Sequence, residues 1–133
     1  MIGLDTNVLA RYIAQDDARQ SLQASRLIEG TSADDPAFVS MVVLAELVWV
    51  LDDVYAMDRD ELVAVVRTLL ETRSIVVQSA PLVWQALRDF RSSSADFSDH
   101  LIARVGSAAG CTETFTFDRK AARTAGMKLV ATP

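Results

Sequence analysis

The sequence contains one cysteine and one histidine, and this scarcity excludes several kinds of protein. Cys111 has no second cysteine with which to form an internal disulfide, so a disulfide-stapled secreted domain is excluded and a reducing, cytoplasmic location is expected. Its simplest role is that of a small buried apolar residue after Gly110. With His100 as the sole histidine, a zinc site built from His and Cys ligands is also disfavoured.

Long apolar segments, a basic leader and phosphate-binding glycine loops are missing as well. The longest apolar stretch, residues 41–51, is interrupted by Glu46 and is far too short to cross a membrane. No basic segment followed by an apolar one opens the chain, so no secretion signal and no membrane partner are expected. Eighteen acidic against thirteen basic side chains give a net charge of -5, which argues against coating of nucleic acid by bulk charge.

What is present is the composition of an ordinary globular protein, with 50% hydrophobic and 23% charged residues. At 133 residues the chain is long enough to bury a core without help from disulfides or a structural metal. There is no repeat, low-complexity segment or Pro-rich or Gly/Ser-rich linker. We therefore expect a single domain over residues 1–133.

Short apolar runs alternate with segments of helical periodicity, which predicts an α/β protein. The architecture expected is a three-layer α/β/α arrangement with a short, mainly parallel central sheet. Strands are predicted at residues 1–4, 37–39, 74–78, 114–117 and 128–131. Helices are predicted at residues 6–14, 18–29, 41–54, 59–70, 79–91, 98–109 and 119–125.

Two aspartates directly follow predicted strands. Asp5 follows the first strand and Asp118 the fourth, and in parallel sheets ligands bind outside the carboxyl ends of the strands. Each also precedes a helix, and taken singly each is explained equally well as an N-cap.

Glu46 is the only charged residue in an eleven-residue segment that is otherwise apolar on every helical face. Such a helix is expected to be buried, and an ionised carboxylate in it requires a cation, a metal or a proton. A salt bridge to an arginine, or a protonated glutamic acid, is the alternative to a functional site.

Asp96 and Asp99 lie three residues apart at the start of an apolar helix, with Ser98 as a plausible cap. The helix dipole alone favours acidic residues there. If Asp5, Glu46, Asp99 and Asp118 converge, however, each pair about 4 Å apart repels by roughly 4 kcal/mol. A hard divalent cation offsets that repulsion, and oxygen ligands point to Mg²⁺ or Mn²⁺.

Four segments of the chain resemble the successive motifs of PIN-domain ribonucleases. They cover nearly the whole sequence in the family's order and spacing, and the length is most similar to that of VapC-type toxins of toxin–antitoxin pairs. The segments are Leu4-Asp5-Thr6-Asn7-Val8-Leu9, Ala45-Glu46-Leu47, Asp96-Phe97-Ser98-Asp99-His100-Leu101-Ile102-Ala103 and Thr116-Phe117-Asp118.

The resemblance implies a role for each matched residue. The acidic quartet that holds Mg²⁺ or Mn²⁺ in the family corresponds to Asp5, Glu46, Asp99 and Asp118. Asn7 and Thr116 match its supporting polar positions, and Asp96 is an extra acid that competes with Asp99 as the primary ligand, with Asp99 the better match. Some relatives carry a further acid where this chain has Lys120, so a second metal site is left open.

The expected activity is metal-dependent endonucleolytic cleavage of RNA, because metal ions can activate water and neutralise phosphate without a catalytic histidine or lysine. Arg104 and Arg119 are candidate phosphate contacts, although solvated helix faces explain most of the basic side chains. The resemblance also implies a homodimer and a VapB-like antitoxin partner.

Two alternatives remain open at this stage. The first is a PIN-like protein-binding module that has lost catalysis. The second is a haloacid-dehalogenase-like phosphatase, which would need a second aspartate where this chain has Asn7.

Overall fold

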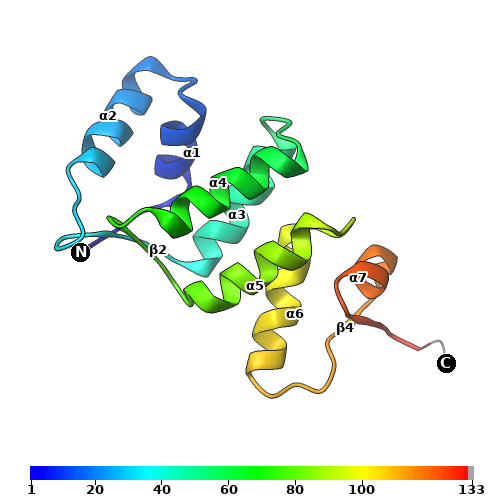
Figure 1. The fold of residues 1–133 in the computed structure, drawn as a ribbon. Helices are drawn as coiled ribbons and strands as arrows, with labels where there is room; N and C mark the ends of the chain where they lie inside the picture. The colour runs from blue at the N-terminus through cyan, green and yellow to red at the C-terminus, as the bar shows by residue number, and fades with distance from the viewer. Residues whose placement is uncertain (132–133) are drawn as a thin grey trace. The chain divides into compact units, whose positions relative to one another are not determined.

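The computed structural model describes residues 1–131 and divides into two compact units. The N-terminal unit comprises Met1–Ala80, and the C-terminal unit begins at Pro81. Figure 1 traces the elements of both in chain order.

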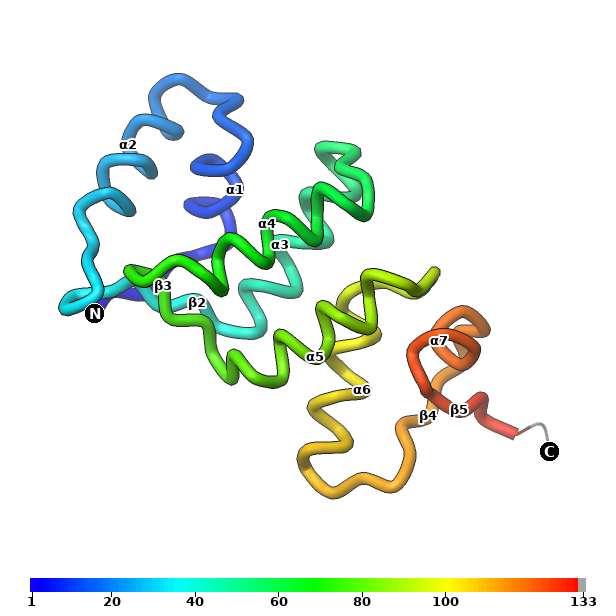
Figure 2. Tube along the Cα trace, in the orientation of Figure 1, coloured from blue at the N-terminus to red at the C-terminus, as the bar shows by residue number. Residues whose placement is uncertain are grey.

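The N-terminal unit contains a three-stranded parallel sheet of order β1-β2-β3 (Figure 2). The central strand pairs with both neighbours, in the registers Ile2↔Ala37 and Ala37↔Ile75. The bounds are β1 (Ile2–Gly3), α1 (Thr6–Ala14), α2 (Ala18–Glu29), β2 (Ala37–Val39), α3 (Met41–Asp53), α4 (Arg59–Glu71) and β3 (Ile75–Val77). The predicted mixed α/β class with parallel strands is confirmed.

Local capping chemistry fixes where the helices of this unit begin. The Ser40 hydroxyl accepts a hydrogen bond from the Val43 N–H at 3.1 Å, so α3 starts where the sequence predicted. Asp58 and Glu61 form a reciprocal capping box at the start of α4. Helix α1 packs against α2 and α3, and α3 packs against α4.

The core of the N-terminal unit is built from branched aliphatic side chains. Those that are essentially inaccessible lie on α1, β2, α3 and α4. They are Leu9, Val39, Leu44, Leu47, Leu51 and Val66. Burial of this kind contributes roughly 1.5–3 kcal/mol per side chain.

The C-terminal unit pairs its two short strands in a separate parallel ladder, with Phe115 opposite Lys128. Its elements are α5 (Ala80–Arg91), α6 (Phe97–Ala108), β4 (Phe115–Thr116), α7 (Arg119–Thr124) and β5 (Lys128–Leu129). The start of α6 differs from the prediction, because the N-cap is Asp96 and Ser98 already lies inside the helix. Asp is favoured at an N-cap as strongly as Ser, and here the Asp96 N–H donates to the Asp99 carboxylate.

Small side chains make up much of the core of the C-terminal unit. Ala95, Ala121, Ala125 and Met127 form one buried cluster, with Ala103 packed against it. Phe97 is fully buried and meets Phe90 edge to face, with ring centroids 5.6 Å apart. The expectation that Cys111 is buried is wrong, since it lies exposed in the loop after α6.

No helix within residues 1–131 has the length and apolar character needed to cross a bilayer.

Candidate functional site

Asp5 lies two residues after the end of β1 and caps α1. Its Oδ1 accepts a hydrogen bond from the Thr6 N–H at 2.8 Å, and the carboxylate is exposed. Because β1 and β2 are parallel neighbours, Asp5 shares the carboxyl edge of the sheet with Ser40, the cap of α3. The capping role foreseen for Asp5 is therefore present, and within residues 1–131 its second carboxylate oxygen accepts no hydrogen bond.

The Thr6 hydroxyl is a feature that sequence reasoning missed. Thr6 is 3% exposed, and its Oγ1 has no hydrogen-bond partner among the described residues. Buried polar atoms are nearly always hydrogen-bonded, so this exception, beside Asp5, requires an explanation. Asn7, the next residue, is exposed and lines a groove of about 310 Å³ between α1 and α2.

Glu46 lies about one and a half turns into α3, and its side chain is exposed. The expectation that it is buried is wrong. The outer stripe of α3 carries two exposed apolar residues, Val42 and Trp49, on either side of Glu46 at helical spacing. Their hydrophobicity made the segment read as buried on every face, whereas burial is confined to the stripe of Leu44, Leu47, Val48 and Leu51.

Asp99 is the half-buried carboxylate of the C-terminal unit. Its Oδ2 accepts a hydrogen bond from the backbone N–H of Asp96 at 3.1 Å. Burial raises the pKa of Asp99 above its usual value, and the negative charges of Asp96 and Asp118 raise it further. The Asp96 N–H and His100 oppose this rise in pKa without cancelling it.

Asp118 caps α7 through a single oxygen. Its Oδ1 accepts hydrogen bonds from the N–H groups of Lys120 and Ala121 at 2.8 and 3.2 Å. Thr116 holds the preceding turn, because its Oγ1 accepts the Asp118 N–H at 2.9 Å. Within the described residues Oδ2 of Asp118 makes no bond, so it is available to a cation near Asp99.

These observations bear on whether the residues suit a hard divalent cation. Neither unit, within residues 1–131, groups three His, Cys, Asp or Glu side chains closely enough to hold an ion by themselves. Mg²⁺, however, is commonly held by one or two carboxylates together with waters and substrate phosphates. The crowded carboxylates around Asp99 and the unpaired Thr6 hydroxyl beside Asp5 both fit such an ion and its waters.

The two arginines predicted to contact RNA differ in their surroundings. Arg104 makes a two-pronged ion pair with Asp89, through Nε–Oδ2 and Nη2–Oδ1 distances of 2.6 and 2.9 Å. This pair lowers the pKa of Asp89 below its usual value. Arg119 is exposed at the start of α7 and belongs to no ion pair among the described residues.

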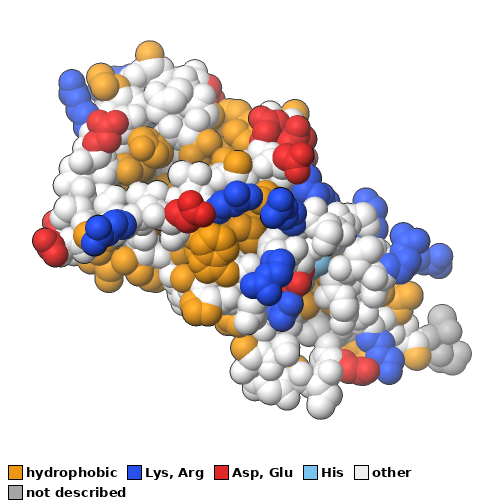
Figure 3. All heavy atoms as spheres, in the orientation of Figure 1, with side chains coloured by type: hydrophobic (Ala, Val, Ile, Leu, Met, Phe, Trp, Pro, Cys, Tyr) orange, Lys and Arg blue, Asp and Glu red, His pale blue; other side chains and the backbone are white. Residues whose placement is uncertain are grey.

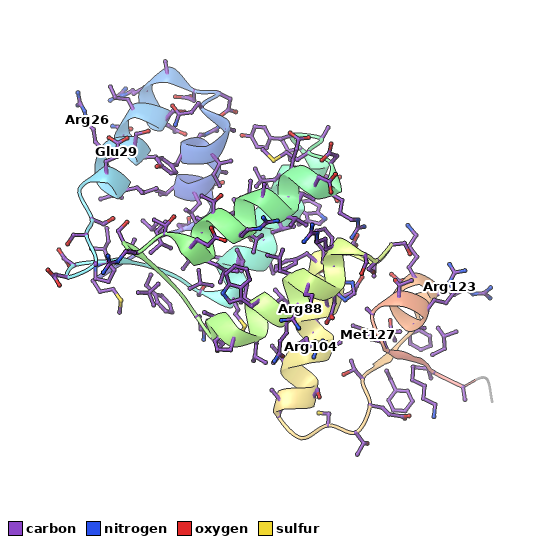
Figure 4. All side chains as sticks on the ribbon, in the orientation of Figure 1. Arg26, Glu29, Arg88, Arg104, Arg123 and Met127 are labelled. Atoms are coloured by element: carbon purple, nitrogen blue, oxygen red, sulfur yellow. The ribbon has the colours of Figure 1, made fainter. Side chains whose placement is uncertain are left out.

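His100 and Ser93 are further residues whose role the sequence did not reveal. His100 is 1% exposed, and its Nε2 lies 2.8 Å from the Ser93 Oγ. His100 also lines a cavity of about 470 Å³, together with Asp89, Arg104 and Thr124 among others (Figure 4 labels Arg104). No local pattern links a serine in a loop to a histidine seven residues later, because their contact depends on how the loop folds over α6.

Comparison with known proteins places these residues in context. The chain is 25% identical over 117 residues to a protein named VapC ribonuclease from Aquifex aeolicus (strain VF5), covering 88% of this chain and 87% of that protein. Residues 2–127 match the profile of the PIN domain. Because that match spans nearly the whole sequence and includes all four acidic motifs, the chain belongs to the PIN-domain family of nucleases.

Proposed function

We propose that this protein is a metal-dependent endoribonuclease and the toxin of a VapBC-type toxin–antitoxin pair. The observation that carries the proposal is the half-buried Asp99 carboxylate, which accepts the Asp96 N–H and whose pKa is raised by burial and by the charges of Asp96 and Asp118. Like-charged groups in a partly buried place are costly unless a cation balances them. Membership of the PIN-domain family and the likeness to a VapC ribonuclease support the same reading.

In this proposal Asp5, Glu46, Asp99 and Asp118 hold Mg²⁺ or Mn²⁺, directly or through water. The ion, when bound, supplies an activated water and offsets the charge of the scissile phosphate. Asp99 is the primary ligand from its motif because it is half-buried, whereas Asp96 is exposed and serves as the N-cap of α6.

The supporting residues act by holding the carboxylates in place. Thr116 accepts the Asp118 N–H and so fixes the turn that presents Asp118. The Asp96 N–H donates to Asp99 and so limits the rotation of its carboxylate. Asn7 lies on the first turn of α1, within reach of a polar group that approaches Asp5.

The substrate and partners follow from the same family. We propose RNA as the substrate, with Arg119 as a phosphate contact and Arg104 as a second contact through the nitrogen not used by Asp89. We further propose a VapB-like antitoxin partner, a homodimer and a cytoplasmic location. The exposed Val42 and Trp49 on α3, at 78% and 58%, support a protein-binding surface.

Metal removal provides the first test. The full chain is incubated with end-labelled single-stranded RNA in Mg²⁺, in Mn²⁺ and in excess EDTA, and the fragment lengths are resolved by electrophoresis. We expect internal cleavage with either ion and none in EDTA. Asp99→Asn should lower the rate by at least about 100-fold, since loss of even an outer-shell partner costs 10–100-fold.

Glu113→Gln is the matched control, because Glu113 is an acid of the same unit that pairs with Lys128. It should cleave at the wild-type rate. Full cleavage in EDTA, or equal loss in both variants, would contradict the metal mechanism. A chain that binds a protein partner but cleaves no RNA with either ion would instead support the non-catalytic binding module.

A further inference from the structure

A branched network of hydrogen bonds centred on Ser93 in the C-terminal unit joins the segments that carry Asp99 and Asp118. The Ser93 Oγ lies 2.8 Å from His100 Nε2 on α6, 3.1 Å from the Thr124 Oγ1 on α7, and 2.9 Å from the Ala95 N–H that donates to it. The Thr124 hydroxyl in turn donates to the Lys120 carbonyl at 2.9 Å. One hydroxyl group therefore connects two helices and the loop between α5 and α6.

Counting hydrogens assigns a direction to each bond. The Thr124 hydroxyl hydrogen goes to the Lys120 carbonyl, so the Thr124 oxygen accepts from Ser93. The single Ser93 hydrogen is thereby used, and both lone pairs of Ser93 remain to accept the Ala95 N–H and His100 Nε2–H. If Ser93 donated to His100 Nε2 instead, no hydrogen would lie between the Ser93 and Thr124 hydroxyl oxygens, which are 3.1 Å apart.

Two branches of this network reach residues of the candidate site. At one end, Lys120 donates its N–H to Asp118, which caps the same helix that Thr124 ends. At the other end, Ala95 and His100 flank the segment in which the Asp96 N–H holds Asp99. The network thus links the turn of Asp118 to the turn of Asp99.

Burial protects the His100 branch of this network, whereas the Ser93–Thr124 bond is exposed. His100 is 1% exposed and lies edge-on to Phe90, with ring centroids 6.4 Å apart. An imidazole nitrogen buried this deeply must keep its hydrogen bond, because a buried polar atom without a partner is costly. The Ser93 oxygen is therefore tied to α6 more firmly than a solvated loop hydroxyl would be.

We propose that His100, Ser93 and Thr124 are positioning residues that fix Asp99 relative to Asp118 and so set the affinity of this unit for a divalent cation. The inference rests on the proposed function, because it assumes that both carboxylates serve one ion. Hydrogen-bonded partners behind a ligand are known to tune metal sites by orienting the ligands.

The test removes single hydroxyl groups and measures Mn²⁺ binding by calorimetry, with kcat and KM for RNA measured alongside. Ser93→Ala and Thr124→Val are expected to weaken Mn²⁺ binding about tenfold and to lower kcat with KM for RNA unchanged. Thr124→Ser, which keeps the hydroxyl, should restore both. Ser92→Ala is the matched control, because this neighbouring hydroxyl lies outside the network.

The possible outcomes separate the two ideas. If Ser93→Ala and Thr124→Val lower only the melting temperature and bind Mn²⁺ like wild type, the residues are merely structural and the inference fails. Failure of Thr124→Ser to rescue, or an equal loss in Ser92→Ala, also overturns it. Wild-type protein that binds Mn²⁺ but cleaves no RNA would contradict the proposed function alone. The Mn²⁺ affinities of the variants relative to wild type would still decide the role of the network.

Discussion

The two units of the molecule differ most in charge. Met1–Ala80 carries thirteen acidic and six basic side chains, whereas residues 81–133 carry five acidic and seven basic ones. The net charge of -5 therefore arises entirely from the N-terminal unit. Bulk charge argued against contact with nucleic acid, but the distribution of charge leaves one unit able to attract phosphate (Figure 3 shows basic side chains on its surface).

The units also differ in how their cores are built. Both units bury large apolar side chains, such as Leu44 and Leu47 in the N-terminal unit and Phe90 and Phe97 in the C-terminal unit. The C-terminal unit also has a buried cluster of three alanines and Met127. Hydrogen bonds of His100, Ser93 and Thr124 join the helices of that unit. The comparison indicates that apolar packing holds both units and that these polar bonds add to it in the C-terminal unit.

The largest effect expected from this comparison comes from core truncation. Leu47→Ala should lower the free energy of unfolding by about 2–5 kcal/mol, because Leu47 is fully buried and its truncation leaves a cavity in the core. Met127→Ala should cost less, because Met127 is 7% exposed, so the space left by its side chain is partly open to solvent. Urea denaturation of both variants measures the difference, and an equal or larger loss in Met127→Ala would break the comparison of cores.

The charge comparison predicts an intermediate effect on RNA binding. Replacing Arg119 and Arg123 together by Gln should weaken binding of single-stranded RNA and reduce the salt slope by about 0.7 per lost phosphate contact. Arg19 and Arg26, exposed on α2 of the acidic unit, provide the matched pair of substitutions (Figure 4 labels Arg26 and Arg123).

Binding is measured in excess EDTA, so that cleavage does not interfere, at several salt concentrations. The α2 pair should leave both affinity and slope close to wild type. Equal slopes for the two double variants would show that the uneven charge has no bearing on RNA.

The smallest effect concerns the two arginine–aspartate pairs, one in each unit. Arg104 lowers the pKa of Asp89 in the folded protein, so the pair stabilises the fold above the unfolded pKa of about 3.9 and this contribution is lost as the pH falls through the lower folded pKa. Asp89→Asn should cost less than about 1 kcal/mol at neutral pH, because both side chains are about one third exposed.

The gap in unfolding free energy between wild type and Asp89→Asn should narrow below pH 4 in urea titrations. Asp16→Asn in the N-terminal unit is the comparison, because Tyr55 and Arg11 also lower the pKa of Asp16. A gap of similar size is expected there, since the side chains of the two pairs are about equally exposed. A gap for Asp89→Asn that widens in acid would contradict the assignment.

Much of the fold could be predicted because it depends on local signals. Helix starts at Ser40 and Asp58 followed from capping chemistry, and the parallel strands followed from apolar runs between helices. The burial of Glu46 could not be predicted correctly, because apolar residues on the outer stripe of α3 look the same in sequence as those in the core. The same limit explains the error at Cys111.

The candidate site shows a similar division. Asp5 and Asp118 were recognised from their places after strands, and both are helix caps as their spacing allowed. The pairing of Arg104 with Asp89, the unpaired hydroxyl of Thr6 and the contact of His100 with Ser93 depend on segments folding together. Sequence spacing carries no information about such contacts.

The sequence by itself determined the scarcity of Cys and His, the order of strands and helices, and the acidic positions that mark a PIN-domain chain. These depend on residue type and short-range periodicity, which the chain encodes directly. Only the tertiary structure decided which carboxylate is desolvated, which arginine is already paired and which hydroxyl joins two helices. Those properties arise from burial and from contacts between distant residues, and the surroundings of a side chain exist only after the chain has folded.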